Sequence, residues 1–130
     1  MHPLALLAAT LLLVACSTPE QPVPGRDRDN HGCIPSAGYQ WSPLADQCLR
    51  LFEQAVRLNS TDSSQTGSAF VLFNADQSLA ELTLPSGEQI RLSRQGNEGD
   101  WSWQGGIYQL FPWKGYVLKS GDQVLYHGDR

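Results

Sequence analysis

From Gly67 onward, the sequence repeats one pattern: short apolar stretches rich in aromatic and β-branched residues, separated by glycine, proline, asparagine and aspartate. The seven apolar stretches are residues 69–73, 79–84, 89–93, 101–104, 107–111, 116–119 and 124–126. Turn residues at this spacing are typical of consecutive antiparallel strands joined by hairpins. Residues 67–130 are therefore predicted to form an antiparallel meander of at most seven strands.

The second stretch shows the alternation expected of a strand with one buried face. Ala80, Leu82 and Leu84 fall on one face, and Glu81 and Thr83 fall on the other. The edges of so small a sheet must be paired or covered. The predicted fold is therefore mainly β: a small antiparallel meander or barrel, with one short N-terminal helix.

That helix is expected directly before the meander. Ser42 suits an N-cap and Pro43 suits the first helical position. An apolar stripe with spacings of three and four residues follows, made by Leu44, Cys48, Leu51, Phe52 and Ala55. Such a stripe indicates about three helical turns. Residues 31–59 are therefore expected to form a loop followed by this helix.

The N-terminus has the features of a lipoprotein signal. The apolar stretch 4–15 is too short to span about 30 Å of hydrocarbon, which favours a cleaved export signal over a membrane helix. Cys16 directly follows Leu-Val-Ala and resembles the cysteine of a lipobox, whose thiol carries a diacylglyceride. Residues 1–15 are thus predicted to be removed and Cys16 to be lipidated. The alternative is an ordinary secretory signal with an incidental cysteine.

Two cysteines then remain, Cys33 and Cys48. In an oxidising compartment they are expected to form a disulfide that ties the helix to the preceding loop. A reactive or metal-binding pair is the alternative, but the sequence places no partner nearby. His31 and His127 also lack an acidic or cysteine partner at ligand spacing, so neither a metal site nor a cofactor is predicted.

The segment 16–30 is predicted to be a flexible tether, since it is polar and rich in proline. It would hold a single folded domain, residues 31–130, away from the lipid surface. Ser17 stands where an acidic residue commonly marks retention in the inner membrane. The prediction is a protein of the cell outer membrane, attached to that membrane through its lipid anchor, with its domain in the periplasm or at the surface.

Charge and motifs favour binding over catalysis. A formal net charge of −4 argues against nucleic acid as a partner. No glycine-flanked serine elbow or phosphate-binding loop is present, so no catalytic residue is predicted. Trp101 and Trp103 would share one face of a strand and fill the core. Trp113 and Lys114 lie between proline and glycine, so they are expected in an exposed turn.

An exposed tryptophan beside a lysine suits a recognition surface. Trp113, Lys114 and Tyr108 are therefore the candidate partner-binding residues, the alternative being that the loop folds back on the core.

Residues 29–41 resemble a cysteine motif, GCIxSAGYxW, found in uncharacterised bacterial envelope proteins. Many of those proteins carry another cysteine where this chain has Ser42. Because Ser42 replaces that cysteine, Cys33 and Cys48 are the only two cysteines that could form a disulfide here. This resemblance implies a location in the envelope but no activity.

Residues 69–126 resemble the membrane-bound inhibitors of c-type lysozyme, which are lipoproteins with a small antiparallel β-barrel. The likeness lies in Gly-Ile-Tyr at 106–108 and Trp-Lys-Gly at 113–115. The chain departs from the family at 99–100, where Gly-Asp replaces Ser-Gly, and it lacks the family's disulfide cysteines. The resemblance implies that Lys114 is a cation able to meet an acidic catalytic cleft.

The sequence thus predicts a lipid-anchored envelope binding protein, with a lysozyme-like hydrolase as the named candidate partner. The alternative is a structural or assembly lipoprotein that contacts other envelope proteins and has no inhibitory activity. A third hypothesis, carriage of a small ligand inside the barrel, predicts a cavity among the aromatic side chains.

Overall fold

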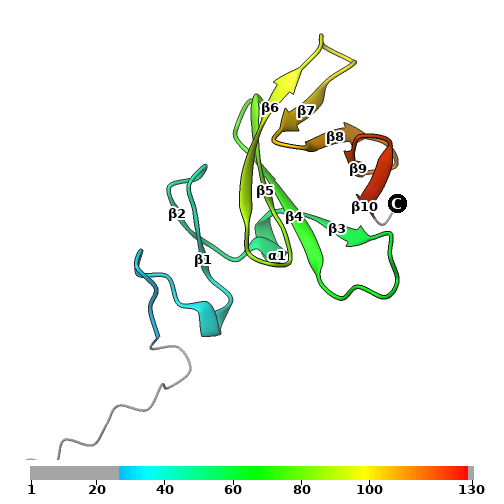
Figure 1. Cartoon of the computed structure of the whole chain (residues 1–130). Coiled ribbons are helices and arrows are strands. Elements are labelled where there is room, and N and C mark those ends of the chain that lie inside the picture. Colours follow the sequence, from blue (N-terminus) through cyan, green and yellow to red (C-terminus); the bar gives the residue numbers. More distant parts are fainter. Residues whose placement is uncertain (1–26, 129–130) are drawn as a thin grey trace, which may run out of the picture.

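The computed structural model describes residues 27–128, and residues 56–127 form a closed antiparallel β-barrel (Figure 1). Its strands follow one another around the barrel in the order β10-β3-β4-β5-β6-β7-β8-β9. They are β3 (Val56–Ser60), β4 (Ser68–Phe73), β5 (Leu79–Thr83), β6 (Gln89–Gln95), β7 (Ser102–Gly105), β8 (Tyr108–Pro112), β9 (Tyr116–Ser120) and β10 (Gln123–His127). The predicted fold class, a mainly β antiparallel barrel, is confirmed.

Each of the seven predicted stretches forms a strand, and β3 is an additional strand that the prediction missed. β3 closes the barrel, because it pairs with β4 on one side and with β10 on the other. The closing ladder is short, with Tyr126 opposite Ser60 and His127 opposite Asn59. Thr61 extends this junction, since its backbone N–H donates to the carbonyl of Leu125 at 3.0 Å.

The barrel interior is filled by buried side chains that alternate with outward ones along the strands. They are Leu58, Ala69, Val71, Ala80, Leu82, Leu92, Trp103, Leu110, Leu118 and Tyr126. Burial of this apolar surface is the main driving force for closing the barrel. These side chains occupy the interior that the ligand-carriage hypothesis requires to be hollow, so that hypothesis finds no support in the barrel core.

Four short elements precede the barrel: the 3-10 helix η1 (Pro35–Ala37), β1 (Gln40–Ser42), β2 (Gln47–Leu49) and the helix α1 (Leu51–Gln54). β1 and β2 pair as an antiparallel hairpin. We refer to residues 27–50 as the disulfide module. It lies against the outside of the barrel, beside β5 and β6 (Figure 1).

The prediction of about three helical turns starting at Ser42 is wrong, because a hairpin occupies most of that segment. Ser42 ends β1 instead of capping a helix, and its carbonyl accepts the backbone N–H of Asp46 at 2.7 Å. Asp46 has a positive φ of 57°, which suits the turn into β2. The helix is confined to α1. Contacts to the barrel, which the local pattern does not reveal, stabilise the hairpin over the helix.

The predicted disulfide between Cys33 and Cys48 is present, with a Cα–Cα distance of 5.5 Å. Cys48 lies in β2 and not in a helix, so the bond joins the hairpin to the preceding loop. The carboxylate of Asp29 shapes that loop by accepting the backbone N–H groups of His31 and Cys33. The hydrogen bond from Cys33 is the main reason why the pKa of Asp29 is lowered.

The folded part begins earlier than the predicted boundary at residue 31. Asp27 already accepts hydrogen bonds from Ser36, and Arg28 donates to the carbonyl of Gly32 at 2.8 Å. Residues 27–30 of the predicted tether therefore belong to the disulfide module. The rest of that tether, the predicted signal 1–15 and Cys16 lie outside the described residues.

Glu81 fixes the disulfide module to the barrel. Its carboxylate accepts the Ser42 hydroxyl at 2.7 Å and the backbone N–H of Leu44 at 3.0 Å. Beside it, the Gln89 side-chain amide donates to the carbonyl of Trp41 at 2.9 Å. Glu81 is only 3% exposed although it points out of the barrel. The strand β5 is therefore buried on both faces, whereas its sequence pattern predicted one solvent face.

Within residues 27–128, no helix has the length and apolar character that crossing a bilayer requires.

Candidate functional site

The β8–β9 turn presents Trp113 and Lys114 to solvent. Pro112 and Tyr116 form the last pair of the two strands, and the backbone N–H of Trp113 donates to the carbonyl of Gly115 at 3.1 Å. Lys114 and Gly115 both have positive φ, 48° and 95°, which tightens the turn. The Trp113 side chain is 66% exposed. The turn is exposed, as its flanking proline and glycine predicted.

The turn continues into the outer face of β8, β9 and β10. Val117 lies opposite Phe111 on one neighbouring strand and opposite His127 on the other, so these three residues form a cross-strand row. Lys119 and Val124 form the next row. Together with Trp113 and Lys114 these side chains line an open hollow of about 850 Å³. We refer to this surface as the Trp113 face.

The Trp113 face carries positive charge on an acidic protein. Lys114 and Lys119 line it together with His127, and among residues 27–128 no aspartate or glutamate does. The whole chain has a formal net charge of −4. The Lys119 ammonium lies 5.8 Å from the centre of the Phe111 ring, above the apolar floor. Apolar side chains with cations beside them suit a ligand that is both apolar and anionic.

Tyr108, the third candidate residue, is not brought to the Trp113 face. It starts β8, opposite Gly105, and therefore lies at the other end of the strand from Trp113. Its side chain is half-buried and packs against the barrel core. We leave Tyr108 out of the proposed binding surface for this reason.

The other two late tryptophans contact the core, as their spacing predicted. Trp103 is buried, and its indole N–H donates to the carbonyl of Gln77 at 2.7 Å. Trp101 is partly buried against the same core, and the Arg94 guanidinium lies 3.8 Å from the centre of its ring. Of these three tryptophans, Trp113 alone has a largely exposed side chain.

Sequence reasoning missed the residues that make the Trp113 face a surface rather than a single turn: Phe111, Val117, Lys119, Val124 and His127. The alternation of inward and outward residues in β8 and β9 nevertheless indicated this surface. Phe111 and Val117 have outward parity, next to the inward Leu110 and Leu118, yet they are apolar. Apolar residues at adjacent outward positions indicate a covered or ligand-binding face.

His31 and His127 lie in different surroundings. His31 stacks on Trp41 in the disulfide module, with ring centres 4.3 Å apart, and His127 belongs to the Trp113 face. Within residues 27–128, no three histidine, cysteine or acidic side chains gather closely enough to hold a metal ion.

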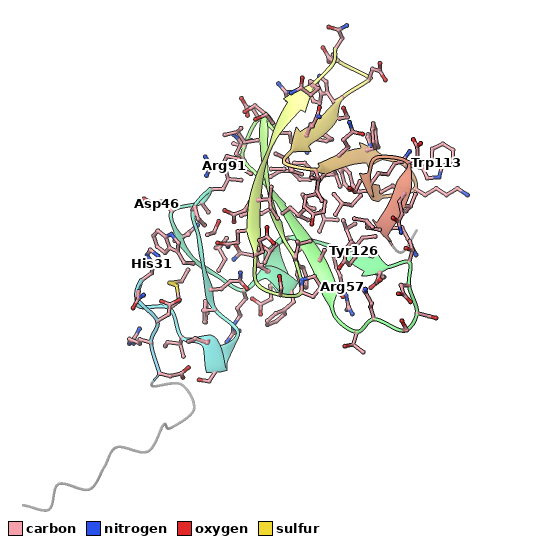
Figure 2. The ribbon with its side chains drawn as sticks, viewed as in Figure 1. His31, Asp46, Arg57, Arg91, Trp113 and Tyr126 are labelled. Carbon is pink, nitrogen blue, oxygen red and sulfur yellow. A yellow bond between two sulfur atoms is a disulfide. The ribbon has the colours of Figure 1, made fainter. Side chains whose placement is uncertain are left out.

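The Trp113 face is far from the point where the described chain begins. Figure 2 shows Trp113 and His31 on opposite sides of the molecule, with the barrel between them. Asp27, the first described residue, lies in the same loop as His31. The Trp113 face and the start of the described chain therefore lie on opposite sides of the barrel.

Comparisons with known proteins match the chain to no protein-family model, no curated protein and no solved structure. The chemistry of the site and the features of the sequence are therefore the basis for inferring function.

Proposed function

We propose that this protein is a lipid-anchored binding protein of the bacterial cell envelope, and that it contacts a protein partner through Trp113 and Lys114. The observation that carries the proposal is the exposure of Trp113 on a tight turn beside a cation. Leaving so large an apolar side chain in water forgoes the stability that its burial would bring. Tryptophans in such positions are frequent anchors of protein interfaces.

The position of the Trp113 face supports a partner away from the membrane. With Cys16 lipidated and residues 16–26 acting as the predicted tether, the Trp113 face, on the opposite side of the barrel from His31 (Figure 2), would be free to face away from the membrane. An anchored protein with its binding surface on that side captures partners from the surrounding fluid or wall. This arrangement fits the outer-membrane location that Ser17 favours.

A lysozyme-like hydrolase is the partner that we propose by name. Glycoside hydrolases of this kind place two carboxyl groups in their cleft. Lys114 projects from a narrow turn, so its ammonium can enter such a cleft while Trp113 packs at the rim. The resemblance to membrane-bound inhibitors of c-type lysozyme supports this choice.

The full exported chain, with Cys16→Ser to prevent lipidation, is expected to inhibit c-type lysozyme. Lys114→Ala should weaken the inhibition by about tenfold, the size of a moderate interface contact. Arg91→Ala is the matched control, because Arg91 is an exposed cation on β6 that does not line the Trp113 face. Undiminished lysozyme activity at micromolar excess of the protein would exclude the inhibitor role.

The alternative is a structural or assembly lipoprotein, for which a second exposed aromatic residue is the favouring observation. Phe52 on α1 is 62% exposed and lies outside the Trp113 face. An assembly role through that surface predicts that Lys114→Ala leaves function intact and that Phe52→Ala does not. Pull-down from envelope extracts with the two variants distinguishes the roles.

A further inference from the structure

The Trp113 face contains a concave site as well as a protruding turn. Its hollow of about 850 Å³ falls within the size range of small-molecule sites, about 300–1,000 Å³. Phe111, Val117 and Val124 supply an apolar floor from three adjacent strands. The hollow is shallow and open to solvent, so it can hold one side of an extended hydrocarbon chain.

We propose that this hollow binds a single-chain anionic amphiphile of the fatty-acid type. Its hydrocarbon chain would lie on Phe111, Val117 and Val124, under the indole of Trp113. Its carboxylate would be attracted by the ammonium groups of Lys114 and Lys119, which both line the hollow. This inference goes beyond the proposed function, which concerns the protruding turn and a protein partner.

Charge complementarity favours this ligand over the other occupants. Two copies of the chain packed through the Trp113 face would bring the two lysines of each, Lys114 and Lys119, toward those of the other, and like charges repel. A cationic amphiphile meets the same repulsion. A bilayer surface is a less suitable occupant, because it would have to contact the side of the molecule opposite the start of the described chain (Figure 2).

Titration with dodecanoate below its critical micelle concentration tests the proposal. The protein is the full exported chain carrying Cys16→Ser, and the readouts are calorimetry and tryptophan fluorescence. Dodecanoate is expected to bind saturably and to shift the emission to shorter wavelength, a shift that Trp113→Phe removes. Dodecyltrimethylammonium, which has the same chain length, should bind at least about tenfold more weakly, since each surface ion pair is worth up to about 1 kcal/mol.

Variants locate the ligand on the Trp113 face. The double change Lys114→Gln and Lys119→Gln should weaken the binding of dodecanoate by about tenfold. The binding of dodecanol, which has no charge, should be unaffected. Arg91→Gln is the control, since it removes a cation elsewhere on the barrel. Val117→Asp should abolish dodecanoate binding by placing a carboxylate in the floor, with near-ultraviolet circular dichroism confirming that the variant is folded.

Three results would overturn the proposal. One is equal affinity for the anionic, neutral and cationic amphiphiles. Another is binding to anionic phospholipid vesicles without binding of monomeric dodecanoate, which would assign the face to a membrane surface. The third is concentration-dependent dimerisation that Val117→Asp abolishes, which would assign it to a second copy. Lysozyme is absent from these titrations, so their outcome is independent of the inhibition assay.

Discussion

Replacing Trp103 by alanine is expected to lower the free energy of unfolding by about 3–5 kcal/mol, the usual cost of truncating a buried tryptophan. The Trp103 side chain is 2% exposed. Its ring lies edge-on to Phe73, with centroids 5.0 Å apart, and its N–H donates to the Gln77 carbonyl at the β4–β5 turn. The truncation therefore opens a cavity and also removes a hydrogen bond to that turn.

Trp113→Ala is the matched control, because it makes the same chemical change on the exposed turn. Its free energy of unfolding should differ from that of the unmodified protein by no more than about 0.5 kcal/mol, the usual range for surface substitutions. Urea unfolding followed by circular dichroism measures both variants. Equal losses of stability in the two variants would show that Trp113 packs on the core, and the exposed binding surface would have to be abandoned.

Replacing Glu81 by alanine is expected to weaken the attachment of the disulfide module to the barrel and to cost about 2–4 kcal/mol of stability. The change leaves two donors, the buried Ser42 hydroxyl and the part-buried Leu44 N–H, without their acceptor. Each unsatisfied buried group costs about 1–3 kcal/mol. Glu81→Gln should lose less stability than Glu81→Ala. The amide oxygen of glutamine can still accept one of the two hydrogen bonds, whereas its amide nitrogen can accept neither.

Hydrogen exchange distinguishes release of the module from unfolding of the barrel. In Glu81→Ala, the backbone amides of β1 and β2 should exchange faster while those of Leu92 and Leu110 in the barrel remain protected. Glu88→Ala is the control, because Glu88 is exposed in the neighbouring β5–β6 turn. Unchanged exchange in β1 and β2 would mean that Gln89 and the remaining contacts hold the module on the barrel without Glu81.

Seven of the eight barrel strands were predictable from the sequence because their determinants are local, whereas β3, which pairs with β10 to close the barrel, was missed. Turn residues separate each pair of strands from β4 to β10, and the alternation within β5 and β6 assigns the inward residues correctly. The hairpin of the disulfide module was not predictable in this way. Ser42-Pro43 and the apolar spacing that follows suit a helix locally, but Ser42 is instead held by Glu81, which lies far along the sequence.

The candidate site was predictable only where a local signal marks it. Proline and glycine around Trp113 and Lys114 indicated an exposed turn, and the turn is exposed. The hollow beside it depends on register across β8, β9 and β10, including the irregularity between Val124 and Tyr126 that sets which side chains point outward. No local pattern encodes that register, so the face could be recognised only after the strands were paired.

The central claim is that the domain is anchored by lipid at Cys16. Mass spectrometry tests it most directly, on protein purified from the membrane fraction of its native cells. The account predicts a mature chain that begins at Cys16 and carries the mass of a diacylglyceryl group with further acylation. A chain that retains residues 1–15, or an unmodified Cys16 in a soluble fraction, would contradict it. Without the anchor, the assignment of the Trp113 face to the side of a tethered domain that faces away from the membrane would fail.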